Sequence, residues 1–303
     1  MKIKVITSYK PGTWDKYADR CVRSIVECWP EGIAINVYHE GLCEESKMFH
    51  PRIKWIDLHQ VQPELMSFKN RHKDDPVACG ELQEIPGGVK RPVEFNGSDK
   101  NKGSFLFDAV RFANKVFCVT HAIRTSIEKD YDYIIWLDAD TYTFRTLPRN
   151  FLESLLPTDS MLTYLGRENP RLSDGGKYPE CGFVGYNLRH PLIQNFADDW
   201  EKIYTTDAVF KLTEWHDSYV FWHLSKLYRQ QHNIKVNDIG YWKGVKGHHV
   251  FINSELGLYI DHFKGKRKNL GSSARNDLRT PGDGAPANVL DIDYWKKVPG
   301  TWR

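Results

Sequence analysis

The sequence contains no long apolar run. None approaches the roughly 20 consecutive apolar residues of a membrane-spanning helix. The opening residues, Met1 to Thr7, intersperse lysine with apolar residues and hold no stretch of signal-peptide length, so we interpret them as the start of a strand. From these absences we expect a soluble protein without a membrane span, located in the cytoplasm.

Cysteine is sparse and lacks metal-binding spacing. The chain of 303 residues holds six cysteines, and the absence of a Cys-x-x-Cys pair argues against a zinc site. A helix carrying both Cys21 and Cys28 would hold them roughly 10 Å apart, too far for a disulfide. We therefore expect reduced thiols, as in a cytosol-like compartment.

The chain also lacks a strong excess of one charge. Its net charge of +3 is too small to indicate nucleic-acid binding, and the densest basic group, Lys264 to Lys268, taken alone is a solvated run. No glycine-rich, basic loop follows the first strand, since Pro11-Gly12-Thr13 is too sparse to cradle a phosphate. This second absence argues against a nucleotidyltransferase.

What is present is an alternation of strand and helix patterns. The opening predicts a β-α-β-β unit, with strands over 2–9, 33–38 and 53–58 and a helix over 15–29 that Pro30 ends. Further patterns predict helices over 104–127, 148–155, 193–204 and 214–228, and strands over 133–137, 160–165, 180–187 and 250–261. This alternation is typical of an α/β fold.

Two stretches show no periodicity. Residues 60–103 hold several prolines and many charges, and they are too numerous for an ordinary connection, so we predict an irregular insertion over the cleft. Residues 269–303 are rich in glycine, proline and asparagine, and we expect them to wrap the surface. Because no repeat or linker divides the chain, we predict one domain, 1–303.

The chain is organised around the stretch from Tyr133 to Asp140, where an apolar run enters Asp138-Ala139-Asp140. A continuous apolar run is typical of a strand buried on both faces, and ligands of open α/β sheets bind beyond the carboxyl ends of strands. Two carboxylates facing one cleft repel each other unless a divalent cation lies between them. A solvated Asp-rich turn is the alternative, so this stretch alone favours a metal site only modestly.

A second motif, His262-x-x-Gly265-x-x-Lys268, lies far downstream. The buried strand, Asp-x-Asp and His-x-x-Gly-x-x-Lys, in this order, resemble the metal-dependent GT-A glycosyltransferases, and in particular the retaining family 8 enzymes that include glycogenin and bacterial galactosyltransferases. Gly182 to Leu188 is similar to a strand of their acceptor region. Trp215-His216-Asp217-Ser218 lies where they carry an acidic motif near the reacting sugar.

The resemblance covers roughly 2–58 and 104–268. It implies a GT-A (Rossmann-like) fold with a mixed, mainly parallel sheet flanked by helices, and transfer of a hexose from a nucleotide sugar, a UDP-sugar, with retention. The insertion at 60–103 and the Asp217-Ser218 pair, where many members carry Asp-Gln, depart from the family on the acceptor side. Compact enzymes of this sort also resemble bacteriophage-encoded glycosyltransferases, which act in the host cytoplasm.

Cleavage of a nucleotide sugar concentrates negative charge on the leaving diphosphate, which a divalent cation and fixed cations stabilise. A ligand set of carboxylates and one imidazole suits Mn²⁺ somewhat better than Mg²⁺. Glycine would let the backbone approach the phosphate, and lysine would contact it as a point charge. We predict that both motifs supply the residues here: the metal ligands Asp138, Asp140 and His262, with Ala139, Gly265 and Lys268 at the donor.

The donor base is expected at the end of the first strand. Thr7 and Ser8 offer hydroxyls, and Tyr9 offers a ring to stack or pack edge-on against the base. Arg111 and Lys115 lie one helical turn apart, and the resemblance implies that a basic residue of this helix contacts the donor. A surface ion pair is an equally good explanation for either residue alone.

Asp217 is the best candidate for the acid beside donor sugar and acceptor hydroxyl, and Glu180 is the second. In a retaining reaction this acid would orient the acceptor or stabilise an oxocarbenium-like centre, whereas in an inverting one it would be the general base. The resemblance favours retention. Asp217 at the first turn of a helix could equally be an ordinary cap.

Two other functions compete with the glycosyltransferase: a sugar-nucleotide nucleotidyltransferase, and a non-catalytic nucleotide-sugar-binding module. The acceptor is open, and a glycan, a protein, a lipid-linked sugar, a modified nucleobase or a small molecule would each be compatible. Aromatic residues of helical spacing could stack on a saccharide, although such residues more often belong to a core: Trp215, Tyr219, Phe221 and Trp222.

Overall fold

A computed structural model describes residues 1–41, 50–81, 84–85, 88–89, 104–168, 177–240, 249–265, 267–273 and 277. Its centre is a seven-stranded sheet in the order β10-β8-β9-β6-β1-β2-β3. Within this sheet β9 runs antiparallel to both its neighbours and the other pairings are parallel. The strands are β1 Ile3–Tyr9, β2 Ala34–His39, β3 Ile53–Asp57, β6 Tyr133–Leu137, β8 Leu162–Glu168, β9 Lys177–Asn187 and β10 Val236–Asp238. The expected α/β fold with a mixed, mainly parallel sheet is confirmed.

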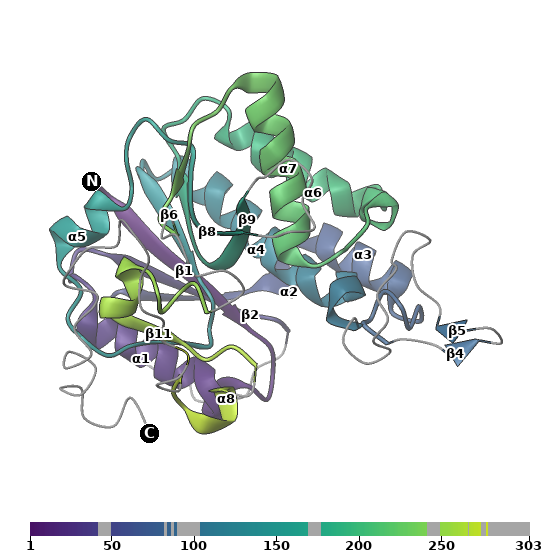
Figure 1. Cartoon of the computed structure of the whole chain (residues 1–303), viewed down its shortest axis with the longest axis horizontal. Coiled ribbons are helices and arrows are strands. Elements are labelled where there is room, and N and C mark those ends of the chain that lie inside the picture. The colour runs from purple at the N-terminus through teal and green to yellow at the C-terminus, as the bar shows by residue number, and fades with distance from the viewer. Residues whose placement is uncertain are drawn as a thin grey trace.

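Helices cover both faces of the sheet (Figure 1). One face packs on α3 (Pro63–His72), α4 (Ala109–Ile127), α6 (Ile193–Thr205) and α7 (Asp217–His232), and the other on α1 (Asp19–Cys28) and α5 (Arg149–Ser154). The central strand β6 alternates between them, with Ile134 and Trp136 in the first core and Ile135 and Leu137 in the second. All four side chains are nearly inaccessible to solvent, which is why the run contains no polar residue.

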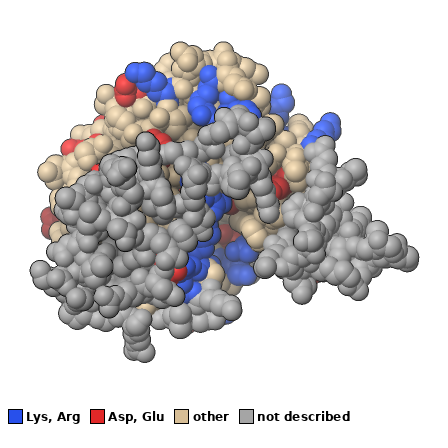
Figure 2. Space-filling model, in the orientation of Figure 1, with Lys and Arg blue, Asp and Glu red and all other residues tan. Residues whose placement is uncertain are grey.

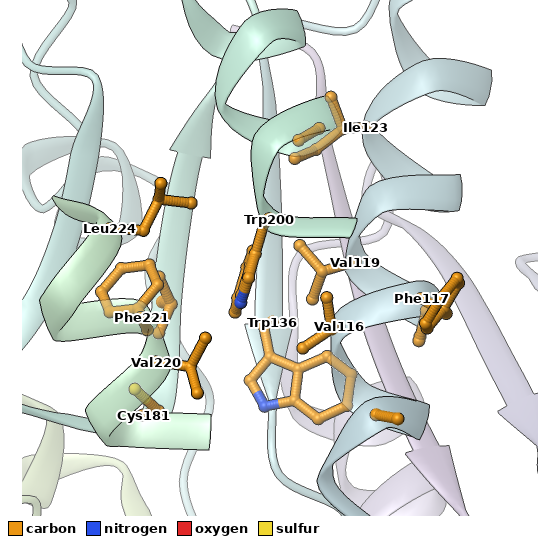
Figure 3. Packing of buried hydrophobic residues seen from close by; sticks show 14 of the residues in the cluster. Val116, Phe117, Val119, Ile123, Trp136, Cys181, Trp200, Val220, Phe221 and Leu224 are labelled. Carbon is orange, nitrogen blue, oxygen red and sulfur yellow. The ribbon is translucent and has the colours of Figure 1, made fainter. Parts of the chain in front are cut away.

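The first core is rich in aromatic rings. Trp200 of α6 packs against Phe221 of α7 with 5.5 Å between ring centroids. Figure 3 shows Trp136 between Val116 of α4 and Val220 of α7. This core holds the start of α4 and the start of α7 close to the end of β6.

The predicted irregular insertion is wrong over its first part. Residues 58–72 form the short helix α2 (Leu58–Val61) and α3, which begins with Pro63 in its first turn. Only Leu65 and Phe68 of α3 are buried, so the helix lacks a wide apolar stripe that would mark it in the sequence. Further on are the two-residue strands β4 (Glu84–Ile85) and β5 (Gly88–Val89), and the rest of 82–103 lies outside the described residues.

The predicted strand over 250–261 is also wrong for most of its length. A 3₁₀ turn occupies Glu255–Leu258, and the strand β11 comprises only Ile260–His262. It pairs antiparallel with β7 (Thr141–Thr143), with His262 opposite Thr141. The short helix α8 (Arg267–Leu270) follows, and residues 278–303 of the predicted wrapping segment lie outside the described residues.

The remaining boundaries differ by a few residues. The predicted helix over 15–29 is a π-helical turn, Trp14–Ala18, followed by α1, and the predicted helix over 104–127 is a 3₁₀ turn, Ser104–Phe107, followed by α4. Asp108 caps α4 by accepting a hydrogen bond from the backbone N–H of Arg111. None of the described helices is both long enough and apolar enough to cross a bilayer.

Lys4 of β1 leads to a prediction about pH. Its Nζ lies 2.8 Å from Ser126 Oγ and over the Tyr131 ring, and burial together with nearby lysines lowers its pKa to about 8. The unfolded chain therefore binds more protons than the folded one between pH 8 and the ordinary value of 10.5, so the free energy of unfolding rises with pH across this window. We expect urea denaturation to show this rise in the parent and in the exposed-site control Lys202→Met, and a flatter profile in Lys4→Met. Parallel profiles for all three would contradict the prediction.

Candidate metal and active site

Asp138, Asp140 and His262 come together beyond the carboxyl end of β6. One ligand atom from each lies within 4.8 Å of the others. His262 Nε2 is 3.2 Å from Asp140 Oδ1 and 3.6 Å from Asp138 Oδ2. The two motifs that the sequence places far apart therefore meet in the folded chain.

The β7–β11 pairing is what joins them. The backbone N–H of Thr141 donates to Asp138 O at 3.1 Å, so the chain turns through the two aspartates and enters β7 at once. Phe263 N–H, next to His262, donates to Asp140 O at 2.8 Å. These backbone bonds register β11 against the aspartates and so keep His262 beside them.

Gly182 of β9 admits the histidine ring. A Cβ at this position would lie 2.7 Å from His262 Cε1 and 2.8 Å from its Nδ1, which is closer than such atoms approach in proteins. The carbonyl of Gly182 also accepts a hydrogen bond from Asp138 N–H at 2.9 Å. The glycine in this strand is thus required by the close approach of His262.

The two aspartates differ electrostatically. Burial disfavours both charges, but His262 and Lys268 beside Asp140 hold the pKa of that carboxyl well below its usual value. Burial and the charge of Asp140 raise the pKa of Asp138, although Lys115 and His262 oppose them. Burial opposes the charged form of His262 as well, yet Asp140 and Glu180 raise its pKa. The two carboxylates repel each other and both attract positive charge, and together with the imidazole they form a ligand set that fits a divalent cation.

Lys268 and Gly265 lie beside this cluster. Lys268 Nζ is 2.9 Å from Asp140 Oδ2 and lies over the Tyr17 ring. Gly265 has φ of +65°, in the left-handed region, and a Cβ there would meet nothing within 4 Å. The glycine thus serves the turn that begins α8, and the close backbone approach to a phosphate that we predicted for it stays a prediction.

Lys115 of α4 is buried between the acids. Its Nζ lies 3.1 Å from Asp138 Oδ1, 2.7 Å from Asp217 Oδ2 and 2.7 Å from the carbonyl oxygen of Cys181. Burial alone would lower the pKa of Lys115, but Asp138 and Asp217 raise it well above its usual value. An ammonium has three N–H donors and all three have protein acceptors here, so Lys115 joins two acids rather than presenting a free donor to a phosphate.

Asp217 occupies the first turn of α7. Burial disfavours its charge, but Lys115 and His216 hold the pKa of this carboxyl well below its ordinary value. His216 is itself buried, with Nε2 2.9 Å from Glu214 Oε2 and 3.0 Å from Tyr178 Oη. The ionised Asp217 is therefore held by a chain of polar side chains that the sequence did not reveal.

Trp136 is another residue that the sequence analysis missed. Its indole N–H donates to Asp138 Oδ1 at 2.6 Å, and Lys115 Nζ lies 4.8 Å from the centre of its ring. A buried tryptophan needs an acceptor for its N–H, and the acid two residues later, just beyond the end of β6, was the available signal.

The predicted base-binding residues separate into two groups. Ser8 Oγ donates to Glu40 Oε1 at 3.1 Å, and Thr7 Oγ1 is buried without a hydrogen-bond partner among the described residues. The ring of Tyr9 is 2% exposed and packs against Trp14 and Trp55, so the structure gives no support to the predicted stacking on a base.

Arg111 and Glu180 differ in exposure and in their neighbours. Arg111 is exposed in the first turn of α4, and its charge acts on Lys268 and on Glu40. Glu180 of β9 is buried, close to Lys264 and to His262. On the face of the molecule drawn in Figure 2, basic and acidic side chains are mixed in the hollow at the centre.

Comparison with known proteins finds similarity among solved structures. No protein-family model matches the chain, and no curated protein matches it. Among the solved structures that do match is the apo form of mouse xyloside xylosyltransferase 1, with 12% sequence identity, a TM-score of 0.44, and coverage of 78% of this chain and 85% of that one.

Proposed function

We propose that this protein is a metal-dependent glycosyltransferase that transfers a hexose from a nucleotide sugar, a UDP-sugar, to an acceptor with retention of configuration. The observation that carries the proposal is the convergence of Asp138, Asp140 and His262, with ligand atoms within 4.8 Å of one another. Lys268, one further motif residue, contacts Asp140 in the same cluster. A nucleotide-sugar donor presents a diphosphate that needs such a combination of cation ligands and fixed positive charge.

The donor set supports a divalent cation. Two carboxylates and an imidazole provide hard oxygen ligands and one nitrogen, which suits Mn²⁺ better than Mg²⁺. The Asp138 side chain is 28% exposed, so the cluster can be reached from solvent. When bound, the cation would neutralise charge on the leaving diphosphate.

The protein's own side chains would bind and orient the reactants. The Lys268 ammonium would leave its contact with Asp140 and bind a phosphate oxygen, acting as a point charge. Asp217 is held ionised by Lys115 and is suited to orient an acceptor hydroxyl or to stabilise positive charge developing at the sugar. Thr7 and Ser8 lie near the carboxyl end of β1. The chain continues from β1 to β2 on one side, whereas the later strand β6 pairs on the other, so the strand order reverses at β1. In open α/β sheets nucleotides bind at such a point.

A thermal-shift panel of nucleotide sugars, with and without Mn²⁺, tests this proposal. We expect a UDP-sugar to raise the melting temperature only when Mn²⁺ is present, because the cation would bridge the protein and the diphosphate. A ligand at 100 times its Kd stabilises the folded state by about 2.7 kcal/mol, which sets the size of the shift. Equal shifts in EDTA would contradict metal dependence. The control Asp140→Asn is expected to show no metal-dependent shift.

The product distinguishes the competing functions. Release of UDP in the presence of an acceptor supports the transferase, whereas release of pyrophosphate from UTP and a sugar phosphate would identify a nucleotidyltransferase. Donor binding that does not depend on metal, together with no turnover on any acceptor, would support a non-catalytic binding module.

A further inference from the structure

Glu180 is a buried carboxylate on the side of His262 that faces away from the aspartates. Its side chain is 6% exposed, and its Oε1 lies 3.7 Å from His262 Nδ1, whereas His262 Nε2 faces Asp138 and Asp140. Lys264 Nζ lies 3.3 Å from the same carboxylate oxygen. A carboxylate with a cationic partner therefore lies beside the ring nitrogen that faces away from the metal cluster.

That ring nitrogen is otherwise unpartnered. In the described part of the chain, His262 Nδ1 is buried and makes no hydrogen bond, an arrangement that costs free energy unless an acceptor becomes available. Glu180 Oε1 is the acceptor at hand, slightly beyond hydrogen-bond range. A small rotation of either side chain would join them.

The surrounding contacts orient the carboxylate of Glu180 and fix the backbone of His262. Gly182 N–H donates to Glu180 Oε2 at 3.1 Å, and Lys264 Nζ is 3.3 Å from Glu180 Oε1. His249 Nε2 lies 2.7 Å from the carbonyl oxygen of His262. The Glu180 side chain is 6% exposed and that of Asp217 is 14% exposed, so Glu180 is better placed to orient a neighbour than to react with a sugar.

We propose that Glu180 is the positioning residue of His262, accepting a hydrogen bond from Nδ1–H and so directing the Nε2 lone pair to a divalent cation held with Asp138 and Asp140. This inference rests on the proposed metal site. It removes Glu180 from the candidates for the reacting acid and leaves Asp217 in that role. A histidine ligand whose second nitrogen is held by a carboxylate keeps one tautomer and one ring orientation.

Mn²⁺ binding to the full chain, without nucleotide, tests the inference, with free Mn²⁺ measured by electron paramagnetic resonance. In Glu180→Gln the single amide oxygen is expected to remain with Gly182 N–H, so the amide nitrogen would face Nδ1 and could not accept its proton. We expect the Kd for Mn²⁺ to rise about 10–100-fold, as for loss of other outer-shell partners. Glu180→Asp, which keeps the charge but shortens the side chain, should lie between this variant and the parent.

Two further variants separate positioning from general destabilisation. Glu201→Gln removes another buried glutamate charge, paired with Arg124 near the end of α4, and should leave the Kd for Mn²⁺ unchanged. Gly182→Ala would push a Cβ against the His262 ring and should weaken Mn²⁺ binding without removing a charge. If Glu180→Gln does not fold, Glu180→Asp and Gly182→Ala decide the question.

The outcomes separate this inference from the proposed function. A parent that binds Mn²⁺ and a Glu180→Gln variant with the same affinity would overturn the positioning role and leave the glycosyltransferase proposal standing. A parent that binds no Mn²⁺ would overturn both. In transfer assays, Glu180→Gln should need more Mn²⁺ for half-maximal activity and approach the parental rate at saturation, a pattern that a purely structural role would not produce.

Discussion

Asp140→Asn is expected to abolish metal-dependent transfer, with activity falling at least about 100-fold, the upper range for loss of a mere outer-shell partner. Asp140 Oδ1 lies 3.2 Å from His262 Nε2 and its Oδ2 lies 2.9 Å from Lys268 Nζ, so this one carboxylate links a proposed metal ligand to the lysine proposed to bind phosphate. Asparagine keeps the shape and loses the charge. Steady-state transfer assays with added Mn²⁺ and with EDTA measure the effect.

Asp159→Asn is the matched control for Asp140→Asn. Asp159 is exposed and pairs with Lys235 on the surface, so this substitution should leave transfer and Mn²⁺ binding unchanged. Circular dichroism melts establish that both variants are folded. Parental activity in Asp140→Asn, or in the parent protein with EDTA, would refute the metal-dependent mechanism.

Among the substitutions considered, Lys115→Met is expected to lower the free energy of unfolding most. Its ammonium is the shared partner of Asp138 and Asp217, and removal of one partner of a buried ion pair costs about 3–5 kcal/mol because the remaining charges stay buried and unpaired. We expect urea denaturation to show this decrease in the free energy of unfolding. Lys235→Met, which removes an exposed lysine from a surface pair, should change it by about 0–1 kcal/mol.

A double-mutant cycle shows whether the loss comes from the buried pair. Asp217→Asn in the Lys115→Met background removes one of the two unpaired charges, so it should recover part of the lost stability, whereas Asp217→Asn alone should destabilise. Contacting residues of this kind commonly couple by about 0.5–3 kcal/mol. Additive effects of the two substitutions would mean that Lys115 does not act through Asp217.

Much of the central sheet could be predicted because its signals are local. The apolar run 133–137 indicates a strand buried on both faces, and its alternate residues do contribute to two different cores. The helix α3 could not be predicted in this way, because only Leu65 and Phe68 are buried and the prolines around it suggested a break. Weak amphipathicity becomes a stable helix only when α4 and α6 are there to pack against it.

The candidate site was likewise predictable only in part. Asp138 and Asp140 could be placed at a strand end from the residues around them, and the resemblance suggested His262 as their partner. The feature that brings His262 there, the pairing of three-residue strands β7 and β11, was not predicted. Strands this short carry no periodicity, and we had expected one long strand in place of a 3₁₀ turn followed by β11.

The sequence by itself therefore determined most strands and helices of the α/β sheet, but not α3 or β10, and the position of two acids beyond its central strand, since these follow from residue spacing and apolar runs. The tertiary structure alone decided that Lys115 bridges Asp138 to Asp217 and that Glu180 lies behind His262. Such contacts join residues far apart in the chain. Their geometry follows from how the packed helices and paired strands meet, and that arrangement is a property of the whole fold rather than of any one segment.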